Sequence, residues 1–258
     1  IRDRSVSRGL GDVYKRQLSD SDLKNYWASS GATSMLPKFV DNMELKLRNF
    51  DPCTILRQTI ETSDVTGGGA ELFLYQSGYL TIKGYQMGVY ILGFPNSEVR
   101  QALYETVLPA LTLRGNSDIQ SIQSDLLLAI QLGNLPEAMK CLKALIADVP
   151  YSNKKLASMD MEERYRLIMS TIFNAIGCRV EVEKMIAMGR IDMVVETTQY
   201  IYVLELKLSD NGGVDAAAEQ IRAKQYAEPF KADKRKVIAF AIELDDRGKG
   251  LVDWKEVF

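Results

Sequence analysis

The chain of 258 residues contains no histidine. This absence excludes Ser-His-Asp and Cys-His catalysis, zinc proteases of the HExxH type and nucleases that depend on histidine, because each of them needs an imidazole. A hydrolytic reaction would therefore have to use carboxylates, lysine and a hard metal ion.

Cysteine is scarce as well. Cys53, Cys141 and Cys178 are scattered, odd in number and lack CxxC spacing. This pattern excludes a disulfide framework and argues against a zinc finger. A reducing cytoplasm is the simplest expected location.

The sequence also lacks a long hydrophobic run and an excess of charge of one sign. No apolar stretch approaches the ~20 residues that span a bilayer, and no segment resembles a signal peptide. We therefore expect no membrane insertion. The formal net charge is −2, so any contact with nucleic acid would need a local basic patch. Apolar residues make up 46% and charged residues 26%, which is typical of a globular protein.

The first fifty residues divide into two segments. Residues 1–17 show no useful periodicity and resemble the read-through sequence found at the ends of metagenomic gene models. We expect this segment to be non-native and the natural chain to continue upstream; a natural extension without fixed structure is the alternative. Residues 18–50 have helical spacing, with Ser19 or Asp20 as the cap.

Residues 51–115 predict a small module that is similar in outline to a winged helix. The glycine-rich loop Thr66–Gly69 lacks the Gly-Lys-Ser/Thr ending of a phosphate-binding loop and is interpreted as a linker. No helix of the module is evidently basic, so a scaffolding role is favoured over DNA binding. The expected elements are helices at 54–62 and 72–77, strands at 79–83 and 89–92, and a further helix that starts at Asn96 or Ser97.

Residues 116–150 predict a helical connector. Two amphipathic helices, 117–131 and 135–148, are separated by Gly133 and Asn134, and Pro150 ends the pair. No more specific role is indicated.

The last segment, 151–258, begins with a helix at 161–176, with Asp160 as its cap and Gly177 just past its end. Strands are expected next at 179–185, 190–197 and 200–208. Thr198 and Gln199 separate the second strand from the third and are interpreted as a two-residue hairpin turn.

This turn would bring charged residues together across the hairpin. It places Asp192 opposite Glu205 and Arg190 opposite Lys207. Glu205 and Lys207 share a face because side chains alternate along a strand. The other face is expected to be apolar, with Ile191, Met193 and Val195 opposite Tyr202, Leu204 and Leu206.

Two carboxylates directly opposite each other repel, with their Cβ atoms ~4.5–5.5 Å apart. A hard divalent cation between them would relieve the repulsion, and Mg²⁺ accepts one or two carboxylates together with water and phosphate oxygens. Lysine beside it could stabilise developing negative charge or help to deprotonate water. The arrangement suits phosphodiester hydrolysis by a metal-activated water. The alternative is a solvated polar face with incidental surface charges; the opposing aspartate and the order of elements favour the site.

The order helix, three strands, helix, strand resembles the core of the PD-(D/E)XK nuclease superfamily. The residues that carry the resemblance are Gly189-Arg-Ile-Asp192 for the aspartate motif and Leu204-Glu-Leu-Lys207 for the (D/E)xK motif. Glu219–Phe230 would form the next helix, Val237–Ile242 the next strand and Asp253-Trp-Lys255 the tail. The resemblance implies an α/β (α+β) restriction-endonuclease-like αβββαβ core after a mostly helical region.

The resemblance also implies roles for single residues. Asp192 and Glu205 would bind Mg²⁺ or Mn²⁺, and Lys207 would be the catalytic lysine. Gln220, a further candidate catalytic residue, and Tyr226 would border the site, with packing and capping as the alternative. Glu162 or Glu163 on the first helix and Glu183 on the first strand are candidate additional ligands, with a solvated surface as the alternative.

More narrowly, residues 22–258 resemble bacterial proteins that join an AAA-ATPase-like domain to a nuclease-like domain. The segments Leu74–Ile82 and Phe94–Val99 have counterparts there. The phosphate-binding loop of the ATPase is missing, and residues 18–50 would be only the tail of that domain. We therefore expect no ATP binding by this chain.

The first predicted function is a Mg²⁺- or Mn²⁺-dependent nuclease acting on DNA or RNA. The alternatives are a catalytically silent nuclease-fold module that binds nucleic acid or protein in a larger ATPase assembly, and a hydrolase of small nucleotides. The oligomeric state is not predicted. Candidate phosphate-contacting residues, with a solvated surface as the alternative, are Arg222, Lys224, Lys231, Lys234, Arg235 and Lys236.

Overall fold

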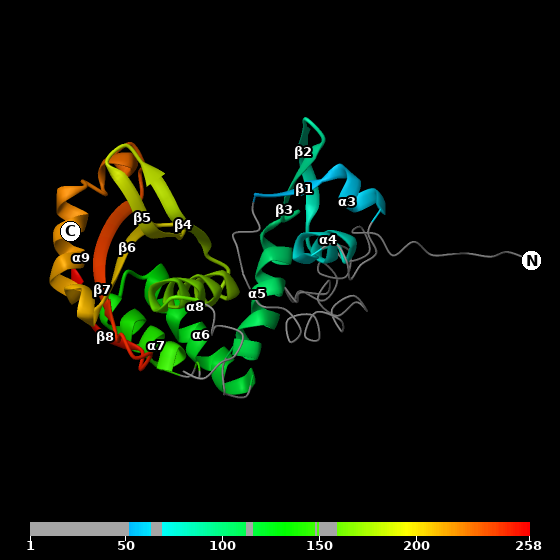
Figure 1. Cartoon of the computed structure of the whole chain (residues 1–258). Coiled ribbons are helices and arrows are strands. Elements are labelled where there is room, and N and C mark those ends of the chain that lie inside the picture. Colours follow the sequence, from blue (N-terminus) through cyan, green and yellow to red (C-terminus); the bar gives the residue numbers. More distant parts are fainter. Residues whose placement is uncertain (1–51, 63–68, 112–115, 148, 150–158) are drawn as a thin grey trace, which may run out of the picture.

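The computed structural model describes residues 52–62, 69–111, 116–147, 149 and 159–258 (Figure 1). The expectations for residues 1–17 and 18–50, and for the linker at 66–68, lie outside the described residues. Within the described part, a small antiparallel sheet is followed by helices and then by a larger mixed sheet.

The small sheet has the strand order β1-β3-β2. Its strands and helices are β1 (Cys53–Leu56), α3 (Arg57–Thr62), α4 (Gly69–Gln76), β2 (Thr81–Gln86) and β3 (Val89–Gly93). The hairpin turns at Met87 and Gly88, which both have positive φ, as a tight two-residue turn requires. The predicted helix–hairpin order is therefore present.

One predicted element in this module is wrong. Residues 54–62 were expected to form a single helix, but Cys53–Leu56 is a strand paired with β3, with Cys53 opposite Leu92. Thr54 and Ile55 are β-branched and suit a strand, and Ile55 is buried against the module's core. The backbone pairing with a strand far along the sequence decides the outcome.

The helical region consists of α5 (Ser97–Leu111), α6 (Asn116–Gln131) and α7 (Leu135–Ala147). Asn96 is the cap of α5, because its Oδ1 accepts a hydrogen bond of 2.9 Å from the Val99 N–H. The turn between α6 and α7 passes through Gly133, whose φ is +71°. In Figure 1, α5 lies between the small sheet and the group formed by α6, α7 and α8.

The C-terminal sheet has the order β4-β5-β6-β7-β8; β6 and β7 are parallel and the other neighbours are antiparallel. Its sequence of elements matches the predicted αβββαβ core with one more strand at the edge. The bounds expected for the second helix, 219–230, are wrong, because the helix spans 213–223 and turns follow it. The elements are α8 (Met161–Ala175), β4 (Arg179–Ile186), β5 (Gly189–Glu196), β6 (Tyr200–Leu208), η4 (Ser209–Asn211), α9 (Gly213–Ala223), η5 (Glu228–Phe230), β7 (Lys236–Leu244) and β8 (Leu251–Glu256).

Helices cover both faces of this sheet. On the face toward α8, Met193, Tyr202 and Leu204 join the large core. On the face toward α9, Val194 and Val203 pack with side chains of that helix. The expectation that only one face of the β5–β6 hairpin is apolar is therefore wrong, because the crossover helix between two parallel strands covers the second face.

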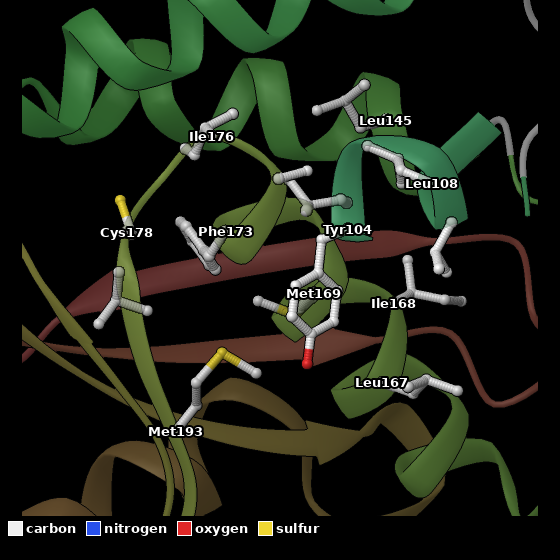
Figure 2. Close-up of a cluster of buried hydrophobic side chains, with 14 of the residues drawn as sticks. Tyr104, Leu108, Leu145, Leu167, Ile168, Met169, Phe173, Ile176, Cys178 and Met193 are labelled. Atoms are coloured by element: carbon white, nitrogen blue, oxygen red, sulfur yellow. The ribbon is translucent and has the colours of Figure 1, made fainter. Parts of the chain in front are cut away.

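The large core also joins the helical region to the sheet. Figure 2 shows Tyr104 and Leu108 of α5, Leu145 of α7, Phe173 of α8 and Met193 of β5 in one buried cluster. Strand β6 is attached to α6 as well, because the Tyr202 hydroxyl donates a hydrogen bond to the Ile130 carbonyl. The helices therefore fix the orientation of the sheet.

We expect Gly133→Ala to destabilise the protein by more than about 2 kcal/mol. The change adds left-handed strain of roughly 1–2 kcal/mol, and the new Cβ would lie 2.8 Å from Cζ and the hydroxyl oxygen of Tyr200. Gly88→Ala is the matched control, since Gly88 has a φ of +83° but no atom within 4 Å of the added Cβ. Urea unfolding should place the control well above Gly133→Ala in stability; equal losses would contradict the steric argument.

Candidate functional site

The predicted register of the β5–β6 hairpin is confirmed from the turn up to Met193 and Leu204, and the expected pairs Asp192–Glu205 and Arg190–Lys207 lie beyond the paired residues. Met193 pairs with Leu204 and Val195 with Tyr202, and the Thr197 N–H donates to the Tyr200 carbonyl across the two-residue turn. The paired ladder ends at Met193 and Leu204. The next residue toward the site on β5 is Asp192.

Asp192 is attached to the backbone of the neighbouring strand. Its Oδ2 accepts a hydrogen bond of 3.0 Å from the Leu206 N–H, and the residue is 5% exposed. The carboxylate thus replaces a main-chain acceptor where the β5–β6 ladder stops. This bond fixes the position of Asp192 beside the strand segment that carries Glu205 and Lys207.

Glu205 is completely buried. Its Oε1 accepts a hydrogen bond of 3.2 Å from Lys207 Nζ, whereas its buried Oε2 has no hydrogen-bond partner among the described residues. Burial, followed by the nearby charge of Asp192, raises the pKa of Glu205 to about 7, and Lys207 only partly opposes this rise. A carboxylate in this position requires further positive charge to ionise readily.

Tyr226 closes the α9 side of the site. Its buried hydroxyl donates a 2.6 Å hydrogen bond to the Arg190 carbonyl and accepts one of 3.0 Å from Gln220 Nε2. The Tyr226 hydroxyl also favours the charged form of Glu205 and so lowers its pKa slightly. Gln220 contacts Tyr226 and so borders the site through that hydroxyl.

Arg166 of α8 lies beside Asp192 and was not identified from the sequence. Its Nη2 lies 4.0 Å from Asp192 Oδ1 and 3.1 Å from Glu162 Oε1, and its Nη1 lies 2.7 Å from Glu183 Oε1. The side chain is only 12% exposed. The i,i+4 spacing from Glu162 predicts that single ion pair, but the contact with Asp192 depends on how α8 packs on the sheet.

The candidate additional ligands lie elsewhere. Glu183 is exposed, has a φ of +55° and binds Arg166 and Arg190, and Glu163 is exposed at the start of α8. They line an open pocket of about 380 Å³ together with Asp160, Glu162, Arg166 and Arg190. Within the described ranges, no three acidic or cysteine side chains gather in a way that could hold a metal ion.

The remaining pair still fits a hard cation. Magnesium accepts one or two carboxylates and completes its shell with water and phosphate oxygens. Asp192 and Glu205 supply two carboxylates, and no residue in the described part of the chain donates a hydrogen bond to the buried Oε2 of Glu205. The geometry therefore fits a two-carboxylate site and gives no support for ligation by Glu163 or Glu183.

The candidate phosphate-contacting residues are not gathered in one patch. Arg235 forms ion pairs with Glu196 and Asp233, near the β5–β6 turn. Lys236 pairs in register with Tyr200, at the opposite end of β6 from Glu205. Lys224 is different, because its side chain lies against Gly189 at the β4–β5 turn.

Comparison with known proteins agrees with this geometry. The model of the PD-(D/E)XK nuclease superfamily matches residues 160–254, which contain α8, the two carboxylates and Lys207. Residues 160–254 are a PD-(D/E)XK nuclease superfamily domain.

A longer similarity connects this nuclease-superfamily domain with the region before it. An uncharacterized protein in the vnfD 5′ region of Azotobacter chroococcum mcd 1 is 28% identical over 256 aligned residues, which cover 86% of this chain and 46% of the relative. The chain thus spans about half the length of that protein. No solved structure matches the chain. Among the described helices, none is long and apolar enough to cross a membrane.

We expect the metal-free protein to lose stability as the pH rises from about 4.5 to about 7. The Glu205 pKa is about 7 in the folded chain against an ordinary value of 4.5. The folded state therefore binds the extra proton, so its stabilisation is complete below the unfolded pKa and is lost as the pH passes the folded pKa. Urea unfolding in EDTA across this range measures the slope.

Glu205→Gln should flatten that slope, because the amide does not titrate. Glu219→Gln is the matched control, since Glu219 is exposed on α9. The control should keep the slope of the unchanged protein. If Glu205→Gln keeps it too, another group causes the pH dependence.

Proposed function

We propose that this protein is a nuclease that hydrolyses phosphodiester bonds in DNA or RNA with Mg²⁺ or Mn²⁺. The observation that carries the proposal is the buried Oε2 of Glu205, which lacks a partner beside the buried carboxylate of Asp192. Lys207 contacts only Oε1, and burying two neighbouring carboxylates with one oxygen unpartnered is costly unless a further cation compensates their charge. The superfamily of residues 160–254 supports phosphodiester hydrolysis as the reaction.

In this proposal, Asp192 and Glu205 hold the cation and Lys207 faces the reacting phosphate. When bound, the divalent cation would polarise a phosphate oxygen and make water acidic enough to attack. Asp192 keeps its position through the Leu206 N–H, so it presents Oδ1 without reorganisation. Lys207 stabilises negative charge that develops on the phosphate. Tyr226, supported by Gln220, orients Glu205.

A second candidate is a catalytically silent nuclease-fold module. Arg166 favours it, because a guanidinium 4.0 Å from Asp192 already supplies part of the positive charge that a metal would bring. Such a module would bind nucleic acid or protein within a larger assembly. We propose an AAA-ATPase-like domain as part of that assembly, on the resemblance of residues 22–258 to bacterial proteins that join such a domain to a nuclease-like domain.

Cleavage of nucleic acid tests the proposal. Purified protein with Mn²⁺ should cleave at least one of four substrates: single- or double-stranded DNA or RNA. Asp192→Asn and Lys207→Ala should each lower the rate by about 10²-fold or more, because each removes a group acting on the reacting phosphate. Glu163→Gln is the matched control and should retain the rate. Circular dichroism verifies that all variants fold.

If the unchanged protein cleaves none of the four substrates faster than the Asp192→Ala, Lys207→Ala double variant does, the nuclease proposal is wrong. The silent module would then be the better explanation. Hydrolysis of small nucleotides without cleavage of polymers would instead favour the phosphate-ester hydrolase.

Metal binding gives an independent test. Titration calorimetry with Mn²⁺ should reveal one site, weakened at least about tenfold by Glu205→Gln, because one of two carboxylate ligands becomes a neutral amide. Glu183→Gln should bind Mn²⁺ as the unchanged protein does, since Glu183 binds Arg166 and Arg190 instead. Equal loss in both variants would restore Glu183 as a ligand. No heat in the unchanged protein would support the silent module.

A further inference from the structure

We propose that the hairpin of residues 184–190, here called the methionine hairpin, inserts its exposed methionines between stacked bases of a nucleic-acid duplex. The proposal names the substrate class of the proposed nuclease site and in that respect rests on the proposed function. It depends on the exposure of two methionines, their distance from Asp192, the support of the hairpin and the charges beside it.

Two apolar side chains are exposed at the tip of the methionine hairpin. Met185 is 76% exposed and Met188 58% exposed, whereas the apolar residues of β5 from Ile191 to Val195 are fully buried. A single exposed apolar residue is ordinary. Met185 and Met188 are three positions apart at one hairpin turn, and their long, adaptable thioether side chains form an apolar tip that a partner could bury.

The tip lies close to the candidate site along one strand. Met188 is followed four residues later by Asp192, and a strand rises ~3.3 Å per residue, so the two Cα atoms are at most ~13 Å apart. Base pairs in a duplex are spaced ~3.4 Å apart along each strand. A duplex with one phosphate at Asp192 would therefore pass the hairpin within about four base pairs.

The hairpin is anchored to the domain core. Tyr226 holds its base through the Arg190 carbonyl, and Ile186 packs against the α9-side core. Lys184 Nζ lies 5.9 Å from the centre of the Phe230 ring. A supported hairpin inserts its tip at a smaller entropic cost than a flexible loop.

Cationic side chains stand beside the apolar tip. The Lys224 side chain packs on Gly189: a Cβ added there would lie 3.0 Å from its Cδ and 3.6 Å from its Nζ. The Arg190 side chain is 50% exposed and shares its charge with Glu183. An apolar wedge flanked by Lys or Arg suits a base step between two phosphates. An uncharged protein surface would gain nothing from these cations.

The β2–β3 hairpin supplies a matched control. Its turn residue Met87 also precedes a glycine and is 92% exposed, but it lies in the small sheet rather than beside Asp192. Replacing Met87 removes a methionine of similar exposure. Any general effect of surface methionines would appear in both variants.

The experiment uses the full chain, a fluorescein-labelled DNA duplex and a second duplex containing 2-aminopurine, whose fluorescence rises on unstacking. Binding is measured by anisotropy in Ca²⁺ and in EDTA. The unchanged protein should bind and raise the 2-aminopurine signal. Met185→Ser, Met188→Ser should weaken binding about tenfold, because the buried apolar contact is lost, and should abolish the signal. Met87→Ser should behave as the unchanged protein does.

Salt dependence separates insertion from phosphate contact. The methionine double variant should keep the slope of log K against log salt, because no charge is removed. Lys224→Gln should lower the slope by about one phosphate contact.

Equal affinity and equal 2-aminopurine signal in the methionine variant and the unchanged protein would overturn the proposal. Failure of the unchanged protein to bind any duplex would do the same, as would methionine-dependent binding to phosphatidylserine vesicles instead of duplex. The cleavage assay is read separately. Base unstacking that depends on the methionines, without cleavage, would support insertion and refute the nuclease proposal. Cleavage that does not change when both methionines are replaced would support the nuclease proposal and refute insertion.

Discussion

The hydrogen bond from the Leu206 N–H to Asp192 Oδ2 organises the C-terminal sheet around its charged residues. It lies where the β5–β6 ladder ends, so a side-chain carboxylate continues the contact between strands that no longer pair. Buried backbone donors need a partner, and here an anion provides it. Because Asp192 is held there, Glu205 is buried beside a like charge. Lys207 and Tyr226 favour the charged form of Glu205, and Arg166 places positive charge near Asp192.

Much of this arrangement could be predicted from local sequence. The Asp160 cap of α8, the turn at Thr198 and Gln199, and the β5–β6 register follow from short-range rules about capping and turns, and the structure confirms all three. The first helix and the three strands after it follow from local sequence patterns, whereas the second helix and the next strand were expected from the resemblance to the nuclease superfamily. The approach of Asp192 to the strand segment that carries Glu205 is local information too, because the two-residue turn sets the register up to Met193 and Leu204.

Other features depend on contacts between distant segments and were missed. Arg166 approaches Asp192 because α8 packs on one sheet face, which no spacing along α8 encodes. Glu183 adopts a positive φ and forms ion pairs with Arg166 and Arg190, which its place on the first strand does not predict. Cys53–Leu56 forms a strand because it pairs with the edge of β3, which lies far along the sequence. Alternation along β5 could not reveal that α9 would cover its second face.

The buried cluster in Figure 2 extends beyond the segment that matches the nuclease superfamily. The family match begins at residue 160, yet α8 buries its apolar side chains against α5 and α7, which precede that boundary. The segment that matches the superfamily is therefore smaller than the part of the chain that shares one hydrophobic core. A chain cut at the family boundary would leave side chains such as Phe173 and Ile168 without part of their packing surface. The helices before the boundary thus act as part of the nuclease-superfamily domain's own interior.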